Sequence, residues 1–220
     1  MSFNFSLITY NSAPPDLWPM SKELIRAVES ADSPASMVAA VQKLAEKKDE
    51  AAIPTLIAVF GYNNPTAAVA AVAGLVELGS VAVPQLLSQI DDYNYGARAY
   101  SIRALSAIAD PRAIEILLTA AATDFAPSVR RAAAKGLGNL HWDKLNEKDR
   151  ASALSRCLET LLNISTDSDW SIRYAAVVGL QALAKIPDLQ QPIQARFKEM
   201  LINDTEKAVC ARVQLTQLAM

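Results

Sequence analysis

The stretch TDFAPSVRRAAAKGLG, residues 123–138, decides the fold. The proline at position 127 suits the first turn of a helix, where its missing N–H costs nothing. Apolar side chains follow at three- and four-residue spacing, at Val129, Ala133 and Leu137, and line one face of that helix. The sequence therefore predicts an amphipathic helix from Pro127, and its small residues allow a neighbouring helix to approach closely.

Similar segments recur along the chain. Four of them align when their central leucines are superposed, at steps of 30, 32 and 43 residues. They are Pro65–Leu75, Tyr95–Leu105, Pro127–Leu137 and Trp170–Leu180. A weaker copy runs from Pro34 to Leu44, and a degenerate sixth lies near Val209. Self-similarity at such a period is typical of a repeat protein.

Other residues also recur at equivalent positions when these segments are aligned, and we call each such set of positions a column. An aspartate stands six residues before an arginine in three units, and a proline opens an earlier apolar segment in two. The residues are Asp92 with Arg98, Asp124 with Arg130, Asp167 with Arg173, and Pro54 and Pro84. Each unit thus contains two helices, and neither can bury its apolar face alone. Such pairs resemble HEAT repeats, and we predict an all-α, HEAT-like α-solenoid of about five to six stacked helix pairs.

The last step is longer than the others, which indicates an insertion near residues 141–150 (HWDKLNEKDR). We expect these residues to extend a loop or the following helix. The solenoid is expected to span residues 21–220. Residues 1–20 are an N-terminal extension with several aromatic and aliphatic side chains, which either caps the first helix pair or docks on a partner.

Composition excludes several classes of protein. The chain has 39 Ala and 25 Leu against 7 Gly, which favours helices, but its apolar runs are too short to insert into a membrane. A net charge of −2 gives no basic field for nucleic acid. One histidine and two cysteines, Cys157 and Cys210, are too few for a zinc cluster, so we expect no metal. The first 20 residues do not read as a signal peptide, and we predict a cytoplasmic location.

Three runs carry a more specific resemblance: DDYNYGARA (91–99), residues 123–138, and WSIRYAAVVGLQ (170–181). They resemble the HEAT-repeat phycobilin lyases, most of all the smaller, F-type subunits of the heterodimeric E/F lyases for the phycocyanin α-subunit. The similarity extends over about residues 22–200.

The resemblance implies an enzyme component that works as a heterodimer with an E-type subunit. Such lyases hold phycocyanobilin, an open-chain tetrapyrrole, and join it through a thioether to a cysteine of the apo-phycocyanin α-subunit. The bilin is then a bound substrate, and no permanent cofactor is expected. The attacking thiol belongs to the acceptor, so this chain contributes positioning and help with proton transfer.

Several residues are candidates for bilin contact. Aromatic rings at the starts of the second helices can stack on pyrrole rings, and arginines can pair with the two propionates. The candidates are Tyr93, Tyr95, Arg98, Arg131, Trp170 and Tyr174. Alternatively, the aromatic residues fill space between units, and the Asp and Arg columns form a ladder that ties helices together. Arg103 and Arg131 lie outside that ladder and are the better ligand candidates, unless they are ordinary solvated charges.

Two residues are candidates for catalysis. Asp124 could accept pyrrole N–H bonds and keep the bilin protonated, but a role in the ladder already explains it. His141, the only histidine, titrates near neutrality and could move a proton. Related lyase-isomerases carry an adjacent His-Cys pair, whereas Trp142 follows His141, so we expect no isomerase activity. Cys157 and Cys210 are expected to be small apolar residues.

Two alternatives to the lyase remain at this point. HEAT-repeat phycobilisome degradation factors recognise phycobiliproteins without attaching pigment. A plain scaffold would use the same surface for protein contact only.

Overall fold

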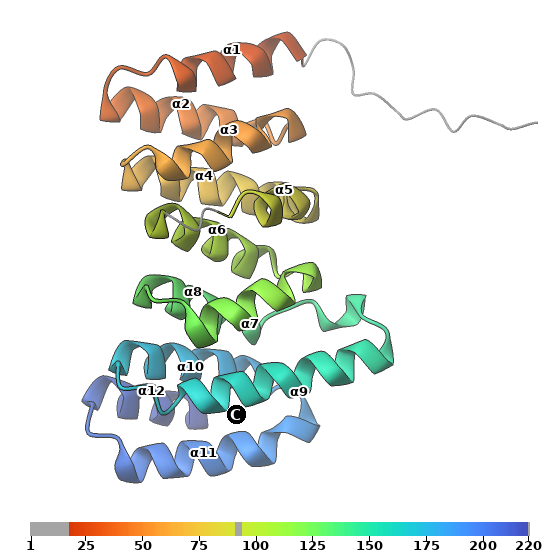
Figure 1. The fold of residues 1–220 in the computed structure, drawn as a ribbon, viewed down its shortest axis with the longest axis vertical. Helices are drawn as coiled ribbons and strands as arrows, with labels where there is room; N and C mark the ends of the chain where they lie inside the picture. Colours follow the sequence, from red (N-terminus) through yellow and green to blue (C-terminus); the bar gives the residue numbers. More distant parts are fainter. Residues whose placement is uncertain (1–17, 91–93, 220) are drawn as a thin grey trace, which may run out of the picture.

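The computed structural model describes residues 18–90 and 94–219, which form six helix pairs stacked in one direction (Figure 1). The helices are α1 (Trp18–Glu29), α2 (Pro34–Glu46), α3 (Ile53–Ala58), α4 (Pro65–Leu78), α5 (Val83–Ser88), α6 (Tyr95–Ile108), α7 (Ile114–Thr123), α8 (Pro127–Leu137), α9 (Glu147–Ile164), α10 (Trp170–Leu183), α11 (Gln190–Asn203) and α12 (Lys207–Leu218). Short 3-10 turns join several of them, and all regular structure in the described ranges is helical. The predicted all-α solenoid is confirmed.

The second helices of the pairs, α2 to α12 in even numbers, form one continuous layer in which each contacts the next. Each of the five aligned segments begins its helix at the predicted residue. Side chains just before these helices fix the starts: the Oδ1 atoms of Asn64 and Asn94 accept the N–H groups of Ala67 and Ala97 at 3.1 and 3.0 Å. Asn64 also donates to the Pro34 carbonyl of the preceding repeat, at 3.0 Å.

Helices α8 and α10 approach so closely that two positions exclude any side chain. A Cβ atom on Gly138 would lie 2.2 Å from the Gly179 carbonyl oxygen, and one on Gly179 would lie 2.4 Å from the Ala134 carbonyl oxygen. Buried alanines, including Ala133, Ala134, Ala175 and Ala176, fill the same interface. Small residues therefore permit the close packing of α8 against α10.

The extra residues of the long repeat form the 3-10 turn Trp142–Lys144 and the start of α9, a helix of 18 residues. Trp142 packs against the core, and Arg156 of α9 forms two hydrogen bonds to Glu115 of α7, at 2.6 and 2.8 Å. In the first helix pair, residues 18–20 form the start of α1. The rest of the predicted N-terminal extension, residues 1–17, lies outside the described residues.

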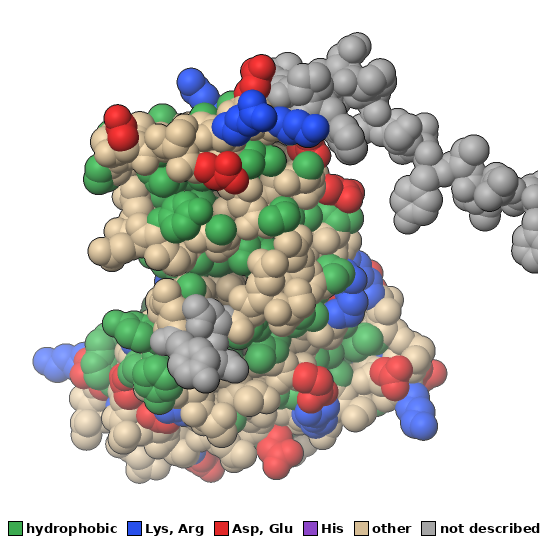
Figure 2. All heavy atoms as spheres, turned by 45° about the horizontal axis from the view of Figure 1, so that its top comes forward, with side chains coloured by type: hydrophobic (Ala, Val, Ile, Leu, Met, Phe, Trp, Pro, Cys, Tyr) green, Lys and Arg blue, Asp and Glu red, His purple; other side chains and the backbone are tan. Residues whose placement is uncertain are grey.

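The edge of the stack at which the second helices begin is hollowed between the N-terminal helices and the C-terminal half (Figure 2). In the same view, charged side chains gather over the two ends of the stack and at its right-hand edge, and the surface between them shows mainly apolar and uncharged groups. Within the described ranges, we find neither a helix long and apolar enough for a membrane nor a group of side chains suited to a metal ion.

Candidate functional site

A ladder of ion pairs connects successive repeats close to the starts of the second helices. Each arginine forms an ion pair with the aspartate of the following repeat. The pairs are Arg98 with Asp124, Arg130 with Asp167, and Arg173 with Asp204, each with an N···O distance of 2.7 Å. The column of Asp and Arg residues is therefore an inter-repeat tie in the described part of the chain.

The first pair contains two of the candidate site residues. Arg98 is only 6% exposed and donates from Nε and Nη2 to Asp124, at 2.7 and 3.1 Å. Asp124 Oδ1 also accepts the N–H of Ala126, at 2.8 Å. Both carboxylate oxygens of Asp124 are thus engaged, and these contacts favour the structural reading of Arg98 and Asp124. Asp92, the partner expected earlier in the ladder, lies outside the described residues.

The last pair shows the electrostatic effect of the ladder. Hydrogen bonds from Arg173 hold the pKa of the Asp204 carboxyl below its ordinary value, although burial opposes this shift. Asp204 Oδ1 accepts the N–H of Glu206 at 2.9 Å, as Asp124 does for Ala126. Each of these aspartates therefore accepts a hydrogen bond from a nearby backbone N–H group. At the same time it forms an ion pair with an arginine of the neighbouring repeat.

Among residues 18–90 and 94–219, four aromatic side chains stand exposed along the edge where the second helices begin. Tyr62, Tyr95, Phe125 and Trp170 are 42%, 57%, 74% and 47% exposed, one in each of four successive repeats. We call these four residues the aromatic edge. The rings of Tyr95 and Phe125 meet edge to face with centroids 6.2 Å apart, and the Arg98 guanidinium lies 5.2 Å from the Phe125 ring centroid. Exposed aromatic rings in successive repeats offer a surface on which a flat ligand can stack.

Sequence reasoning identified Tyr95 and Trp170 but missed Tyr62 and Phe125. Phe125 directly follows a ladder aspartate, and Tyr62 stands three residues before Pro65, so alignment of the loops before each helix would have found both. Tyr93, another predicted contact, lies outside the described residues. Tyr95 also lines a groove of about 310 Å³ between the starts of α4 and α6, together with Phe60, Asn64 and Tyr100.

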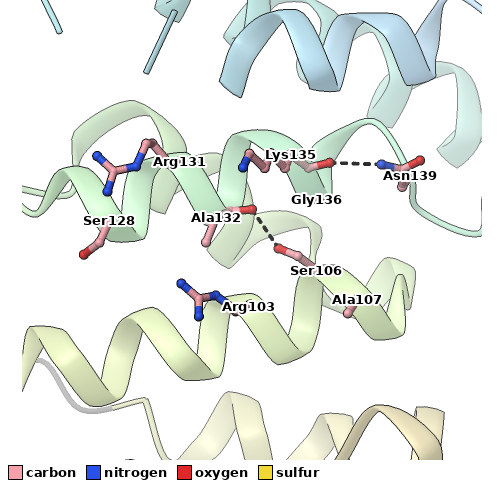
Figure 3. Close-up of a pocket in the computed structure, with 9 residues that line it drawn as sticks. All are labelled: Arg103, Ser106, Ala107, Ser128, Arg131, Ala132, Lys135, Gly136 and Asn139. Atoms are coloured by element: carbon pink, nitrogen blue, oxygen red, sulfur yellow. Dashed lines mark hydrogen bonds between the residues drawn. The ribbon is translucent and has the colours of Figure 1, made fainter. Parts of the chain in front are cut away.

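A second groove, of about 400 Å³, lies between α6 and α8 (Figure 3). Its lining carries three cationic side chains: Arg103 from α6, and Arg131 and Lys135 from α8. We call the space bounded by these three residues the cationic groove. The remaining lining residues are uncharged: Ser106, Ala107, Ser128, Ala132, Gly136 and Asn139. Sequence reasoning had singled out Arg103 and Arg131, but not Lys135.

Tyr174, another predicted contact, is half-buried in α10. The Arg212 guanidinium of α12 lies 5.9 Å from its ring centroid and hydrogen-bonds Gln181. The Arg131 guanidinium in turn donates to the hydroxyl of Ser171, at 3.0 Å, next to Trp170. The cationic groove is therefore linked directly to the C-terminal end of the aromatic edge.

His141 lies apart from the other candidates. It follows the C-terminal end of α8, whereas Tyr95, Asp124 and Trp170 lie where second helices begin. His141 is exposed, and its backbone N–H donates to the Ala109 carbonyl at 2.8 Å. The structure therefore does not bring His141 together with Asp124.

Cys157 is fully buried in α9, and burial raises the pKa of its thiol to about 12. Cys210 is half-buried and its Sγ donates to the Asp204 carbonyl at 3.3 Å. A thiol attacks as its thiolate, so Cys157 is unsuited to act as a nucleophile.

Comparison with known proteins gives consistent matches. The HEAT repeats family matches residues 64–138 and 83–160. The "Phycocyanobilin lyase subunit beta" of Nostoc sp. strain PCC 7120 is 70% identical over 198 residues, which cover 90% of this chain and 99% of the relative. The "Phycobilisome maturation protein" of Synechococcus elongatus is 48% identical and covers 90% of this chain and 97% of the relative.

A solved structure is also similar. A chain in the complex of CpcE and CpcF of phycocyanin lyase from Nostoc sp. PCC7120 superposes with a TM-score of 0.75 at 73% identity. The match covers 77% of this chain and 99% of that chain.

Proposed function

The chain belongs to the phycobilin lyase family of HEAT-repeat proteins, and we propose that it serves as the F-type subunit of a heterodimeric lyase that attaches phycocyanobilin to the phycocyanin α-subunit. The carrying observation is the 70% identity, over nearly the whole relative, to a phycocyanobilin lyase subunit. The names of the relatives favour this function over a degradation factor or a plain scaffold.

The reaction joins the acceptor cysteine to the bilin by addition of a thiol across a double bond. A carbon–sulfur bond forms, the thiol proton passes to the bilin, and no other reactant is consumed. The chain supplies no nucleophile in this proposal, in keeping with the burial and raised pKa of Cys157. Its contribution is to hold the bilin in one orientation while the acceptor thiol approaches, which lowers the entropic part of the barrier.

We place the bilin contact along the aromatic edge and the adjoining side chains Arg131 and Tyr174. Tyr95 and Trp170 offer exposed rings for stacking. Arg98 and Asp124 act one step back, because their ion pair fixes the loop that carries Phe125. His141 stands outside this surface, at the far end of α8.

An E-type subunit is the proposed partner, as in the solved complex of CpcE and CpcF. The last described helix pair exposes three large aliphatic side chains, Ile202 on α11 and Leu215 and Leu218 on α12. Exposed apolar side chains of this size are costly in water, which supports a partner contact at this pair.

The proposal is tested by mixing the chain with an E-type subunit, phycocyanobilin and the apo-phycocyanin α-subunit. Bilin fluorescence that stays with the acceptor after denaturation measures thioether formation. We expect attachment to be faster than with either subunit alone or with bilin alone. Equal rates with and without the chain would refute the proposal, and loss of colour from intact phycocyanin would identify a degradation factor instead.

A further inference from the structure

The cationic side chains of the groove form no ion pair with a carboxylate of the described residues. Among the described residues, six arginines form ion pairs with carboxylates: Arg98, Arg112, Arg130, Arg156, Arg173 and Arg196. Arg103, Arg131 and Lys135 form no such pair in the same ranges, although they line one groove together. The chain as a whole carries a net charge of −2, so this grouping of cations runs against the overall charge.

Contacts with neighbouring side chains hold two of these cations in place. The Arg131 guanidinium donates to Ser171 Oγ, and that hydroxyl donates to Asp169 Oδ1 at 2.7 Å. The Arg103 guanidinium lies 5.4 Å from the ring centroid of Tyr100, within reach of a cation–π contact. Supported cations lose less entropy when they engage an anion than free surface side chains do.

Direct contacts between α6 and α8 form the floor of the groove. Ser106 Oγ donates to the Ala132 carbonyl at 3.1 Å, which ties α6 to α8 (Figure 3). A Cβ atom on Gly136 would lie 2.2 Å from Ser106 Oγ, so the close crossing needs glycine there. The positions of Arg103 on α6 and Arg131 on α8 are thus fixed relative to each other by backbone packing.

The surroundings of Arg131 indicate which kind of anionic ligand fits the groove. Asp169 accepts the proton of the Ser171 hydroxyl, and the Arg131 charge acts on its carboxyl without a direct ion pair between the two side chains. Arg131 joins the groove to Ser171, the neighbour in sequence of Trp170, whose ring is exposed. A ligand with a carboxylate beside a flat conjugated system would satisfy both features at once.

We propose that the cationic groove binds the two propionate carboxylates of the open-chain tetrapyrrole, with Arg103 and Arg131 as the principal partners and Lys135 as a third charge. The inference rests on the proposed function and deepens it, because it assigns the carboxylate end of the substrate to α6 and α8. The pyrrole rings then extend past Ser171 toward Trp170. The groove selects for bilins with free propionates and orients the bilin along the stack.

The test compares free phycocyanobilin with its dimethyl ester, in which both carboxylates are masked. Each is titrated, by its visible spectrum, into the full chain complexed with an E-type subunit. The variant is Arg103→Gln/Arg131→Gln. The control is Lys148→Gln/Lys198→Gln, which removes two exposed charges from α9 and α11. We expect the variant to bind the free acid about tenfold more weakly than wild type and control, and to bind the ester as they do.

Three outcomes would overturn the inference. Equal affinity of wild type for acid and ester would show that no carboxylate is recognised. An equal loss in variant and control would show a general charge effect. Unchanged bilin binding with weaker capture of the apo-phycocyanin α-subunit would assign the groove to an acidic protein surface. In each case the attachment assay on wild type still decides the proposed function separately.

Discussion

Arg98 of α6 and Asp124, which precedes α8, form a buried two-bond ion pair between adjacent repeats, with Nε to Oδ2 at 2.7 Å. Asp124→Asn should lower the free energy of unfolding by about 3 kcal/mol, because the buried Arg98 charge would lose the carboxylate that accepts two of its hydrogen bonds. Urea unfolding followed by circular dichroism measures the change. Arg98→Met/Asp124→Leu should cost less than the sum of the single variants, since it removes both charges of the pair together.

The matched control for the ladder is the exposed pair of Lys48 and Glu77, with an N···O distance of 2.7 Å. Glu77→Gln should leave the unfolding curve unchanged, because water screens this pair. A similar loss from both variants would mean that burial does not set the strength of the Arg98–Asp124 pair.

Gly138→Ala should destabilise the fold by about 1–3 kcal/mol, because the new methyl group would collide with the Gly179 backbone. Gly61→Ala is the control, since a Cβ atom there meets nothing within 4 Å. Thermal unfolding of the two variants should differ clearly. Equal transition temperatures would show that α8 and α10 can separate without cost.

Cys157 should resist alkylation in the folded protein. With a thiol pKa of about 12, it is almost entirely protonated at pH 8 and it is shielded from reagent. Iodoacetamide followed by peptide mass spectrometry should label Cys210 first and Cys157 only after urea is added. Rapid labelling of native Cys157 would contradict its placement in the core.

Asp204 should contribute stability that depends on pH. Its pKa is lowered in the folded state, so its contribution is complete above the ordinary value of 3.8 and is lost as the pH falls through the lower, folded value. Asp204→Asn should therefore lose more stability relative to wild type at pH 7 than at pH 3. Asp143→Asn, an exposed carboxyl, is the control. A constant difference across this range would argue against a proton-linked contribution.

Trp170→Ala should slow bilin attachment about tenfold, because an exposed stacking surface is removed while the core is left intact. Trp170→Phe keeps a ring and should retain most of the rate. Attachment assays with an E-type subunit, alongside circular dichroism for folding, measure both. An unchanged rate for the alanine variant would remove Trp170 from the bilin contact.

The starts of the second helices could be predicted from the sequence because local chemistry fixes them. A proline or a short polar cap followed by an apolar stripe determines the first turn at Pro34, Pro65 and Pro127. The periodic columns then indicated stacking, since no single pair can bury its own apolar face.

The partners of the ladder could not be read from the sequence. The columns predicted a ladder that ties helices within and between repeats, and spacing alone did not say which aspartate each arginine meets; the fold joins Arg98 to Asp124 and Arg130 to Asp167. The cationic groove was hidden for the same reason. Arg103 and Lys135 are 32 residues apart, and only the crossing of α6 and α8 brings them to one space.

The ladder also changes how neighbouring repeats are held together along the stack. Its three buried ties join the repeats from α6 to α12, where the Gly138–Gly179 contact adds a close backbone approach. Between α2 and α4, the described ion pair is the exposed one of Lys48 and Glu77. Opening the stack at the starts of α8, α10 or α12 would therefore separate two largely buried opposite charges, so these crossings resist splaying by electrostatics as well as by packing.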